Sequence, residues 1–421
     1  MPKMFIERSA LPTLFLVTLL TWCGTGVAAP DEEAMGKSMG YPMAPKPGQY
    51  DDDPYMVGSF SGMDGANPHC TMEASSTPLN LQKDSSEPSF RYKFRGSTLS
   101  LDDYMQHQRV TGLLILKNGK IVAERYNYDR KPSHRMLSQS MAKTIVALAV
   151  GKAVEEGLIR SIEDTAASYV PQIAGTLYGQ TKIVNLLRMA SGAQFVHDHS
   201  PNDDRAKFAK LTRTQGVVAA IKSVTERAAP EGEVFNYTNS QTAVLGLVVR
   251  AVTGQTLCSY VEAKLWKPMG AESRATWLTN PADQFEQFPG GFNATVRDYA
   301  RLGSLLANDG QNDGRSVVTR DWLLKMTDAQ LQPARFRPGT MLHHGTTWHG
   351  YGFQTWLIPG ISRRFALEGI HGQSILVDPD LKLVVVHTAV GKDASGDASG
   401  AHFGAERTAL WRGIVTHYGK W

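Results

Sequence analysis

The sequence predicts a mixed α/β (α+β) fold in which one sheet is assembled from distant parts of the chain. Strand-like patterns occur at residues 110–128 and again between residues 351 and 388, and the pattern between them is mostly helical. Strands at both ends of a helical insert favour a single sheet with a helical lobe, at about residues 160–310. The 421 residues, 42% of them hydrophobic, suffice for one large domain or two fused layers.

The first 29 residues resemble a secretory signal peptide. Lys3 and Arg8 precede a short apolar run at residues 10–20, and small residues follow at 24–29. The apolar run is shorter than the stretch that a transmembrane helix needs. We therefore expect a periplasmic or secreted protein with no stable membrane span after the signal is cleaved.

Three cysteines bear on this expectation. Cys23 is a poor lipoprotein site because the bulky Trp22 precedes it, so lipid anchoring is not expected. Cys70 and Cys258 remain in the mature chain. In an oxidising compartment the two could form a disulfide, although free or buried thiols are an equal alternative.

Residues 30–88 are rich in Gly, Pro, Asp, Ser and Met and show little periodicity. This composition predicts an extended, poorly structured N-terminal arm, with regular structure beginning near Phe90. The net charge of +4 is small, and no lysine- or arginine-rich run suggests a nucleic-acid partner.

Residues 110–128 predict a β-hairpin, because Asn118-Gly119 is a strong turn signal between two apolar runs. An apolar helix should follow from about residue 140. Later helices are predicted at 183–189, 215–221, 241–252, 297–307 and 406–417, and strands at 351–358, 364–368, 373–377 and 382–388.

The tetrad Ser140-Met-Ala-Lys143 is the most informative motif, because it places a hydroxyl and an amine one helical turn apart. The apolar run that follows is hydrophobic on nearly every side, so the helix belongs in a core. Its N-terminus has free backbone N–H groups and a dipole that favour negative charge. A helix cap followed by a snorkelling lysine is the alternative interpretation.

Tyr237-Thr-Asn239 lies 97 residues after Ser140 and directly before a helical run. A tyrosine beside an ammonium can have its pKa lowered, so a phenolate or a neutral lysine could take the serine proton. The amide of Asn239 could hold a substrate carbonyl or the lysine. By itself the tripeptide also fits an exposed tyrosine and a helix cap.

Gly369-Ile370-His371 follows a predicted strand. A glycine there permits close backbone approach, and a backbone N–H opposite that of Ser140 would complete a two-donor oxyanion hole. His371 could supply a polar contact to substrate. A histidine packed under the turn is an equal alternative.

Together these three motifs resemble the serine β-lactamase and penicillin-binding superfamily, in particular its class C β-lactamase and family VIII esterase branch. The resemblance covers about residues 90–421 and includes 187–192, 290–295 and 298–303. The segments 351–356 and 369–373 look most like those of 6-aminohexanoate-dimer (nylon-oligomer) hydrolases.

The resemblance implies a β-lactamase-like serine hydrolase domain at residues 89–421, with a central antiparallel sheet flanked by helices and an all-helical lobe over the cleft. It implies that Ser140 is the acylated nucleophile, Lys143 its proton partner and Tyr237 the general acid/base. The N–H groups of Ser140 and Ile370 would form the oxyanion hole. No cofactor is needed, and the expected partner is a small amide or ester substrate.

One departure bears on the substrate. Many members carry Lys-Thr-Gly on the edge strand, whereas the matching residues here are Leu367-Glu368-Gly369. Without the ammonium group of that lysine, binding of a penicillin or D-Ala-D-Ala carboxylate is disfavoured. An amidase or esterase is therefore preferred over a β-lactamase or D-alanyl-D-alanine carboxypeptidase. A non-catalytic binding protein that retains the fold is the alternative from another class.

Other features are weaker. Histidines cluster at 197–199 and 343–349, but no carboxylate stands at ligand spacing on a regular element, so no metal site is predicted. Trp348 and Trp356 could line a substrate pocket, although core packing is the ordinary role of such residues.

Overall fold

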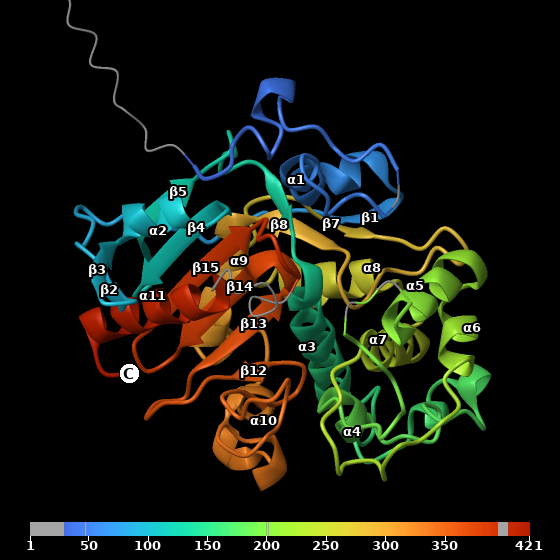
Figure 1. The fold of residues 1–421 in the computed structure, drawn as a ribbon. Coiled ribbons are helices and arrows are strands. Elements are labelled where there is room, and N and C mark those ends of the chain that lie inside the picture. The colour runs from blue at the N-terminus through green and yellow to red at the C-terminus, as the bar shows by residue number, and fades with distance from the viewer. Residues whose placement is uncertain (1–28, 47, 199, 201, 395–402) are drawn as a thin grey trace, which may run out of the picture.

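A computed structural model describes residues 29–46, 48–198, 200, 202–394 and 403–421, so the predicted signal peptide and Cys23 lie almost wholly outside the described residues. Its centre is a seven-stranded antiparallel sheet in the order β11-β12-β13-β14-β15-β4-β5 (Figure 1). The strands are β4 (Val110–Lys117), β5 (Lys120–Tyr126), β11 (Gly350–Tyr351), β12 (Trp356–Leu357), β13 (Phe365–Gly369), β14 (Gln373–Asp378) and β15 (Leu383–Ala389).

This sheet confirms that distant segments build one layer. The predicted hairpin is present, and both of its turn residues take the positive φ that a tight hairpin turn needs, 52° at Asn118 and 75° at Gly119. Strand β4 also pairs with β15, with Leu114 opposite Val386. The predicted strand at 351–358 is instead two short strands, β11 and β12, joined by a turn.

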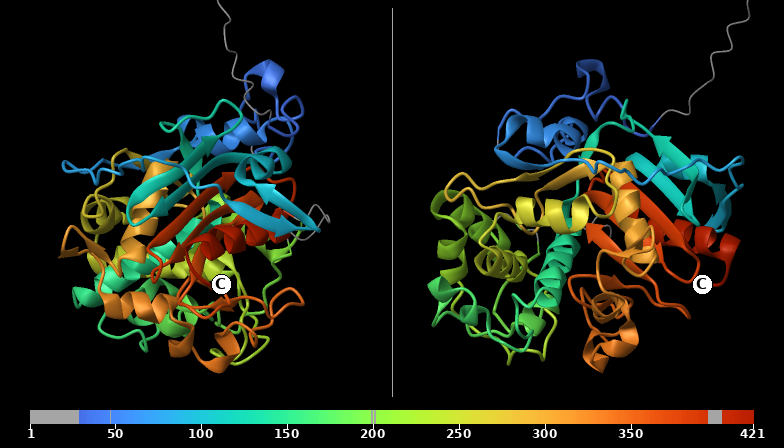
Figure 2. Two further views of the ribbon diagram at one scale, coloured as in Figure 1. Left: turned by 90° about the vertical axis from the view of Figure 1, so that its left-hand side faces the viewer. Right: turned by 180° about the vertical axis from the view of Figure 1, so that it is seen from behind.

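Helices cover both faces of the sheet (Figures 1 and 2). On one face Leu113 and Ile115 pack in a core that includes residues of α2 (Leu101–His107) and α11 (Phe403–Tyr418). On the other, Leu114 packs with residues of α3 (Ala142–Glu155) and α9 (Val296–Ala307). The alternation of strand side chains between the two cores produces a three-layer arrangement.

The helical lobe lies beyond α3, which separates it from the sheet (Figure 1). Its elements are η3 (Ala166–Ser168), η4 (Pro171–Ile173), α4 (Ile183–Leu187), α5 (Asp204–Gln215), α6 (Val217–Lys222), α7 (Asn239–Thr253), α8 (Leu257–Val261) and η5 (Glu262–Trp266). Outside it lie α10 (Arg320–Thr327), η6 (Ala329–Leu331), η7 (Ala334–Phe336) and the hairpin of β2 (Arg91–Phe94), β3 (Ser97–Ser100). The short strands β9 (Gln311–Asn312) and β10 (Arg315–Ser316) pair as a hairpin.

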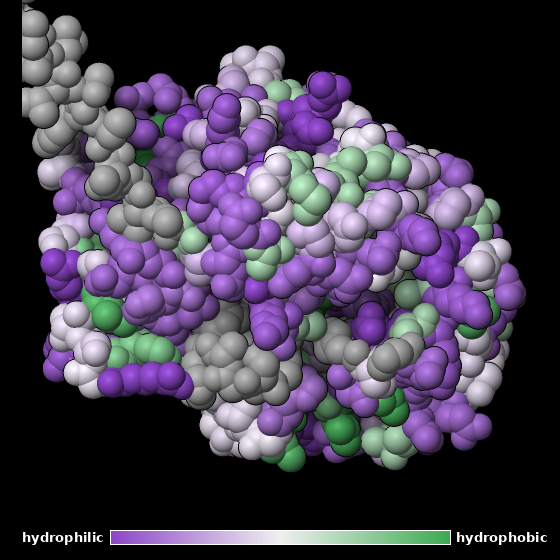
Figure 3. Space-filling view, turned by 45° about the horizontal axis from the view of Figure 1, so that its top comes forward, coloured by the Kyte–Doolittle hydropathy of each residue, from purple (hydrophilic) through white to green (hydrophobic). Residues whose placement is uncertain are grey.

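Within the described part of the chain, no single helix has the length and hydropathy to cross a membrane. Helix α7 together with the following helical segment passes that test only as a pair bent by 76°, and α7 contributes much of its length to the core. The face shown in Figure 3 is mostly hydrophilic, with hydrophobic residues scattered over it.

The segment 160–310 is not all helical, which corrects the prediction for the lobe. Strands β7 (Ala275–Leu278) and β8 (Phe292–Thr295) join β1 (His69–Met72) and β6 (Arg135–Leu137) in a second sheet, ordered β1-β7-β8-β6. These strands have three or four residues, and β7 and β8 are buried on both faces. Such short strands show no alternation, and their partners lie too far away in sequence for a local pattern to reveal them.

The prediction that residues 30–88 are extended and poorly structured is also wrong. The segment contains η1 (Lys37–Met39), α1 (Met56–Ala66) and β1, and it lies over the top of the sheets (Figures 1 and 2). The Tyr128 hydroxyl donates a hydrogen bond to the Pro30 carbonyl at 2.8 Å, and Arg109 pairs with Asp53 at 3.1 Å. The segment gains its order from partners elsewhere in the chain, which its own composition does not show.

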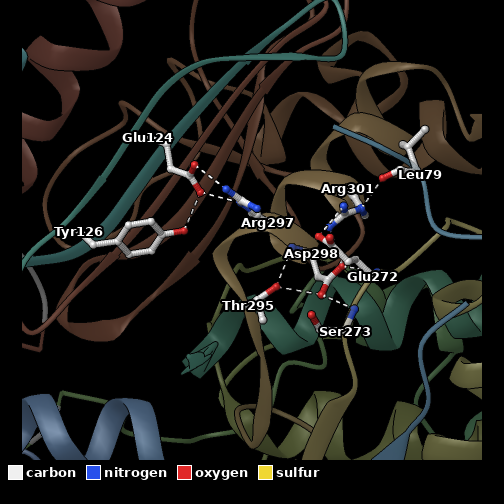
Figure 4. Close-up of polar contacts among 9 residues, drawn as sticks. All are labelled: Leu79, Glu124, Tyr126, Glu272, Ser273, Thr295, Arg297, Asp298 and Arg301. Carbon is white, nitrogen blue, oxygen red and sulfur yellow. Dashed lines mark hydrogen bonds and ion pairs between the residues drawn. The ribbon is translucent and has the colours of Figure 1, made fainter. Parts of the chain in front are cut away.

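A buried ionic cluster anchors the start of α9 (Figure 4). Asp298 accepts hydrogen bonds from the backbone N–H groups of Glu272 and Ser273, at 2.8 and 3.1 Å. Arg301 pairs with Asp298 at 3.0 Å and donates to the Leu79 carbonyl at 2.8 Å. Two segments distant in sequence are thereby held to one helix end, with the buried charges paired and hydrogen-bonded.

Cys70 on β1 and Cys258 on α8 form a disulfide across a sequence separation of 188 residues. The sequence left a disulfide and free or buried thiols as alternatives, and the structure contains the disulfide. The bond attaches the N-terminal segment covalently to the helical lobe.

We expect that replacing both cysteines by alanine lowers the free energy of unfolding by about 2–4 kcal/mol, because the unfolded chain regains the entropy of a long open loop. Urea titration of the oxidised wild type and the double variant measures this difference. Equal midpoints and slopes for the two proteins would contradict it.

Candidate active site

The candidate nucleophile stands where the sequence predicts, at the entrance to a buried helix. Ser140 lies in the short helix η2 (Gln139–Met141), which leads directly into α3. Eleven of the fourteen residues of α3 are buried, so its position is fixed by core packing. The preceding residue, Gln139, has φ = 46°, a left-handed conformation that is uncommon outside glycine and is often found at functional sites.

Lys143 lies beneath Ser140 and is 1% exposed. Its Nζ is 2.8 Å from Ser140 Oγ, 2.8 Å from Asn239 Oδ1 and 3.1 Å from the carbonyl oxygen of Pro289. The structure thus brings together Ser140 of η2, Lys143 of α3 and Asn239 of α7. Asn239 binds the lysine, which is one of the two roles considered for it from the sequence.

Burial lowers the pKa of Lys143 to about 7, because the surrounding protein solvates an ammonium less well than water does. Its three oxygen partners are uncharged, so none of them restores the ordinary value through an opposite charge. A neutral amine can donate its two N–H groups to Asn239 and Pro289. Its lone pair then faces the Ser140 hydroxyl, which is the arrangement of a general base.

Tyr237 completes the group, but with the opposite pKa shift from the one expected. Its ring centroid is 5.0 Å from Lys143 Nζ. Burial raises the pKa of Tyr237, and a hydrogen bond with Ser140 offsets this only in part. This shift favours the neutral lysine, the other base considered from the sequence, over a phenolate. With its pKa at about 7, Lys143 is only partly protonated near neutral pH, so it favours a phenolate less than a full ammonium would, and Tyr237 remains a proton donor.

The third motif, Gly369-Ile370-His371, contributes to the site with backbone atoms rather than side chains. A Cβ added to Gly369 would lie 2.7 Å from the Ser138 carbonyl oxygen and 3.0 Å from the Ser140 nitrogen, so only glycine fits without displacement. Ile370 follows at the start of η8 (Ile370–Gly372) and lines the same cleft as Ser140. The C-terminal end of β13 therefore lies against η2, as an oxyanion hole requires.

His371 does not contribute a polar contact to this cleft, which corrects its assignment as a substrate residue. It takes φ = 58° and packs under the turn, with Nδ1 2.7 Å from the Gly391 carbonyl oxygen and the ring edge-on to Phe60 at 5.5 Å. It is 4% exposed. Burial lowers its pKa, so it serves as a neutral packing residue behind the turn.

The cleft has a volume of about 2240 Å³, and Ser140, Tyr237, Asn239, Gly369 and Ile370 all line it. Aromatic rings form one of its walls. Trp356 lies 5.3 Å from Tyr237 and 5.9 Å from Phe235 between ring centroids.

Trp348 also lines the cleft, so both tryptophans that the sequence singled out face it. Burial lowers the pKa of His343 to about 3, and this ring therefore adds to the wall as a neutral group. Next to Tyr237 the cleft is accordingly suited to an apolar part of a substrate.

Sequence reasoning missed three contributors. The Pro289 carbonyl carries no side-chain signal, and only the fold places it against Lys143. Tyr50 comes from the N-terminal segment and lines the cleft, where its hydroxyl is hydrogen-bonded to Gln139. Arg407 comes from α11 and pairs with Glu368 at 3.3 Å. Pro289, Tyr50 and Arg407 all lie far in sequence from the Ser140-Lys143 tetrad, so no spacing rule connects them to it.

The histidines of the cleft do not gather as a metal site would. Among the described residues, the only group of three ligand-type side chains within reach of one ion is Cys70, Cys258 and Glu286, and its cysteines form the disulfide. His197 Nδ1 lies 3.1 Å from the backbone oxygen of Tyr237, so it contacts the catalytic tyrosine candidate instead. His199 lies outside the described residues.

The fold and this constellation define a class of protein. The beta-lactamase family model matches residues 100–407, most of the chain, and the chain belongs to that family. It is a hydrolase of the β-lactamase superfamily.

Its similarity is to nylon-oligomer hydrolases in particular. The 6-aminohexanoate-dimer hydrolase of Paenarthrobacter ureafaciens is 26% identical over 295 residues, which cover 68% of this chain and 74% of that protein. A structure from Bacillus anthracis provisionally assigned as a 6-aminohexanoate-dimer hydrolase has a TM-score of 0.77 at 23% identity, covering 87% of this chain and 95% of its own. The hydrolase EstCE1 shares the fold with a TM-score of 0.55 at 18% identity, covering 73% and 96%.

We expect Gly369→Ala to lower kcat/KM for hydrolysis by about tenfold or more, because the new methyl group pushes the Ile370 turn away from the Ser140 nitrogen. The thermal midpoint should change little, since the displacement is local. Gly65→Ala on α1 is the matched control, because a Cβ there meets no atom within 4 Å. Full activity of Gly369→Ala would show that the turn need not approach so closely.

Proposed function

We propose that the chain is an exported serine hydrolase that cleaves an amide or ester bond through an acyl-serine intermediate. The observation that carries this proposal is the 2.8 Å contact between Ser140 Oγ and a lysine whose pKa burial lowers to about 7. A lysine in that state is an effective base near neutral pH.

In the first half-reaction the Ser140 hydroxyl gives its proton to the Lys143 amine, and Oγ bonds to the substrate carbonyl carbon. The carbonyl oxygen becomes an oxyanion next to the backbone N–H groups of Ser140 and Ile370. The bond to the leaving group breaks as Tyr237 protonates that group. The proton held by Lys143 then restores the Tyr237 hydroxyl.

In the second half-reaction water replaces the leaving group. It loses a proton to the neutral Lys143 and attacks the acyl carbon. The ester bond to Ser140 breaks, and the serine oxygen takes back a proton from the same pair of residues, as reversibility requires. The carboxylic acid product leaves, and the site returns to its starting state. Every proton is thereby passed among Ser140, Lys143, Tyr237, the substrate and water.

Two features support the rest of the proposal. The disulfide between Cys70 and Cys258 is of a kind that persists in oxidising compartments, which favours export. The similarity to 6-aminohexanoate-dimer hydrolase and the aromatic wall beside Tyr237 favour a linear, partly apolar amide or ester. Glu368 in place of a cation disfavours a β-lactamase or carboxypeptidase activity.

Ser140→Ala should abolish labelling by a fluorophosphonate probe, because the serine oxygen is the only atom proposed to be acylated. Intact mass spectrometry of wild type and variant after incubation with the probe measures this. Ser138→Ala is the control, since that neighbouring hydroxyl donates to the Gln139 carbonyl and should not be needed for labelling. Equal labelling of Ser140→Ala and wild type would refute the proposal, as would a wild type that no probe or substrate acylates.

The rate of acylation should rise with pH through about 7 and then level off, because below its pKa the Lys143 ammonium cannot accept the serine proton. Presteady-state release of p-nitrophenol from a p-nitrophenyl ester gives this profile. Lys143→Arg should lose the rise and most of the rate, since arginine stays protonated. A rise centred near the ordinary pKa of a carboxyl group would assign the base to another residue.

A further inference from the structure

Glu368 forms a buried ionic group at the margin of the candidate active site. Its Oε1 lies 3.3 Å from Arg407 Nη2 and 3.8 Å from His349 Nε2. Glu368 immediately precedes Gly369 on β13, and Glu368, Arg407 and His349 all line the cleft. The Arg407 side chain is 9% exposed and that of Glu368 is 17% exposed, so the pair borders the cavity and is largely shielded from solvent.

The carboxyl group of Glu368 is ionised in this setting. Burial alone would raise its pKa, but the Arg407 charge and the contact with His349 outweigh burial and hold the pKa at about 2. Its negative charge reaches the reacting groups, because it contributes to the raised pKa of Tyr237. A fixed carboxylate therefore stands close to the point where substrate must bind.

Arg407 and His349 together form a position that would suit a carboxylate from a substrate, since a guanidinium pairs strongly with such a group. In this chain Glu368 already occupies it. We propose that Glu368 is the charge-selecting residue of the cleft, which makes the enzyme reject substrates with an anionic group near the scissile bond and accept neutral or cationic ones. This inference rests on the proposed function and names the substrate class for it.

The physical basis is a difference between two kinds of substrate. An anionic group entering the cleft would meet the Glu368 charge, and Arg407 cannot serve both carboxylates equally well. A neutral or ammonium-bearing chain meets no such repulsion. The nearby rings of Trp348 and Trp356 also suit a cationic or alkyl group.

The test uses p-nitrophenyl esters of hexanoic acid, adipic acid and 6-aminohexanoic acid. Their acyl chains are matched and end in a neutral methyl group, an anionic carboxylate and a cationic ammonium, respectively. Acetate esters of 3-hydroxybenzoate and 3-hydroxybenzamide place the charge difference on the leaving side. In the wild type kcat/KM for the anionic member of at least one set should be about tenfold or more below that of its neutral partner. Equal rates within both sets would overturn the inference without any variant.

Glu368→Gln should raise the anionic-to-neutral ratio of kcat/KM by about tenfold or more, because Arg407 can then bind the substrate carboxylate. Adding Arg407→Gln should remove that gain. Glu226→Gln, which neutralises an exposed carboxyl group outside the cleft, should leave the ratio unchanged. Thermal unfolding of each variant confirms that it is folded.

Two outcomes separate this inference from the proposed function. If Ser140-dependent turnover is present but the ratio is the same in wild type and Glu368→Gln, the inference is overturned and the proposed function stands. If the neutral ester is hydrolysed equally by wild type and Ser140→Ala, the proposed function falls, and the inference falls with it.

Discussion

The burial of one lysine is the constraint on which the site depends. Lys143 is removed from water and surrounded by uncharged oxygen atoms, so its ammonium is poorly solvated and its pKa falls to about 7. An exposed lysine at the same spacing would be protonated and could not act as a base. The apolar helix α3 imposes the burial, and the carbonyl of Pro289 and the amide of Asn239 orient the amine toward Ser140.

The rest of the fold can be understood as holding other groups against this helix. The central sheet brings β13 to its N-terminus, where Gly369 permits a backbone contact that any side chain would prevent. The second sheet and the anchored α9 bring together segments from both halves of the chain, and the disulfide ties the N-terminal segment to the lobe. That segment precedes the part matched by the family model, yet Tyr50 reaches the cleft.

Local patterns were sufficient for long or sharply bounded elements. The Asn118-Gly119 hairpin, the helices at 241–252 and 297–307 and the strands at 364–368, 373–377 and 382–388 were predicted close to their observed limits. The second sheet was not, because strands of three or four residues depend on partners far away rather than on their own alternation. For the same reason helix α1 was missed, since residues 30–88 are stabilised mainly by packing on the body of the protein.

The sequence by itself determined the identity and order of the candidate reactive groups. A serine and a lysine one turn apart on an apolar helix must share a face, whatever surrounds them. Only the tertiary structure decided their charge states, because a pKa depends on burial and on neighbours from other elements. It raised the pKa of Tyr237 and lowered that of Lys143 to about 7, turned His371 away from the cleft, and placed Arg407 beside Glu368.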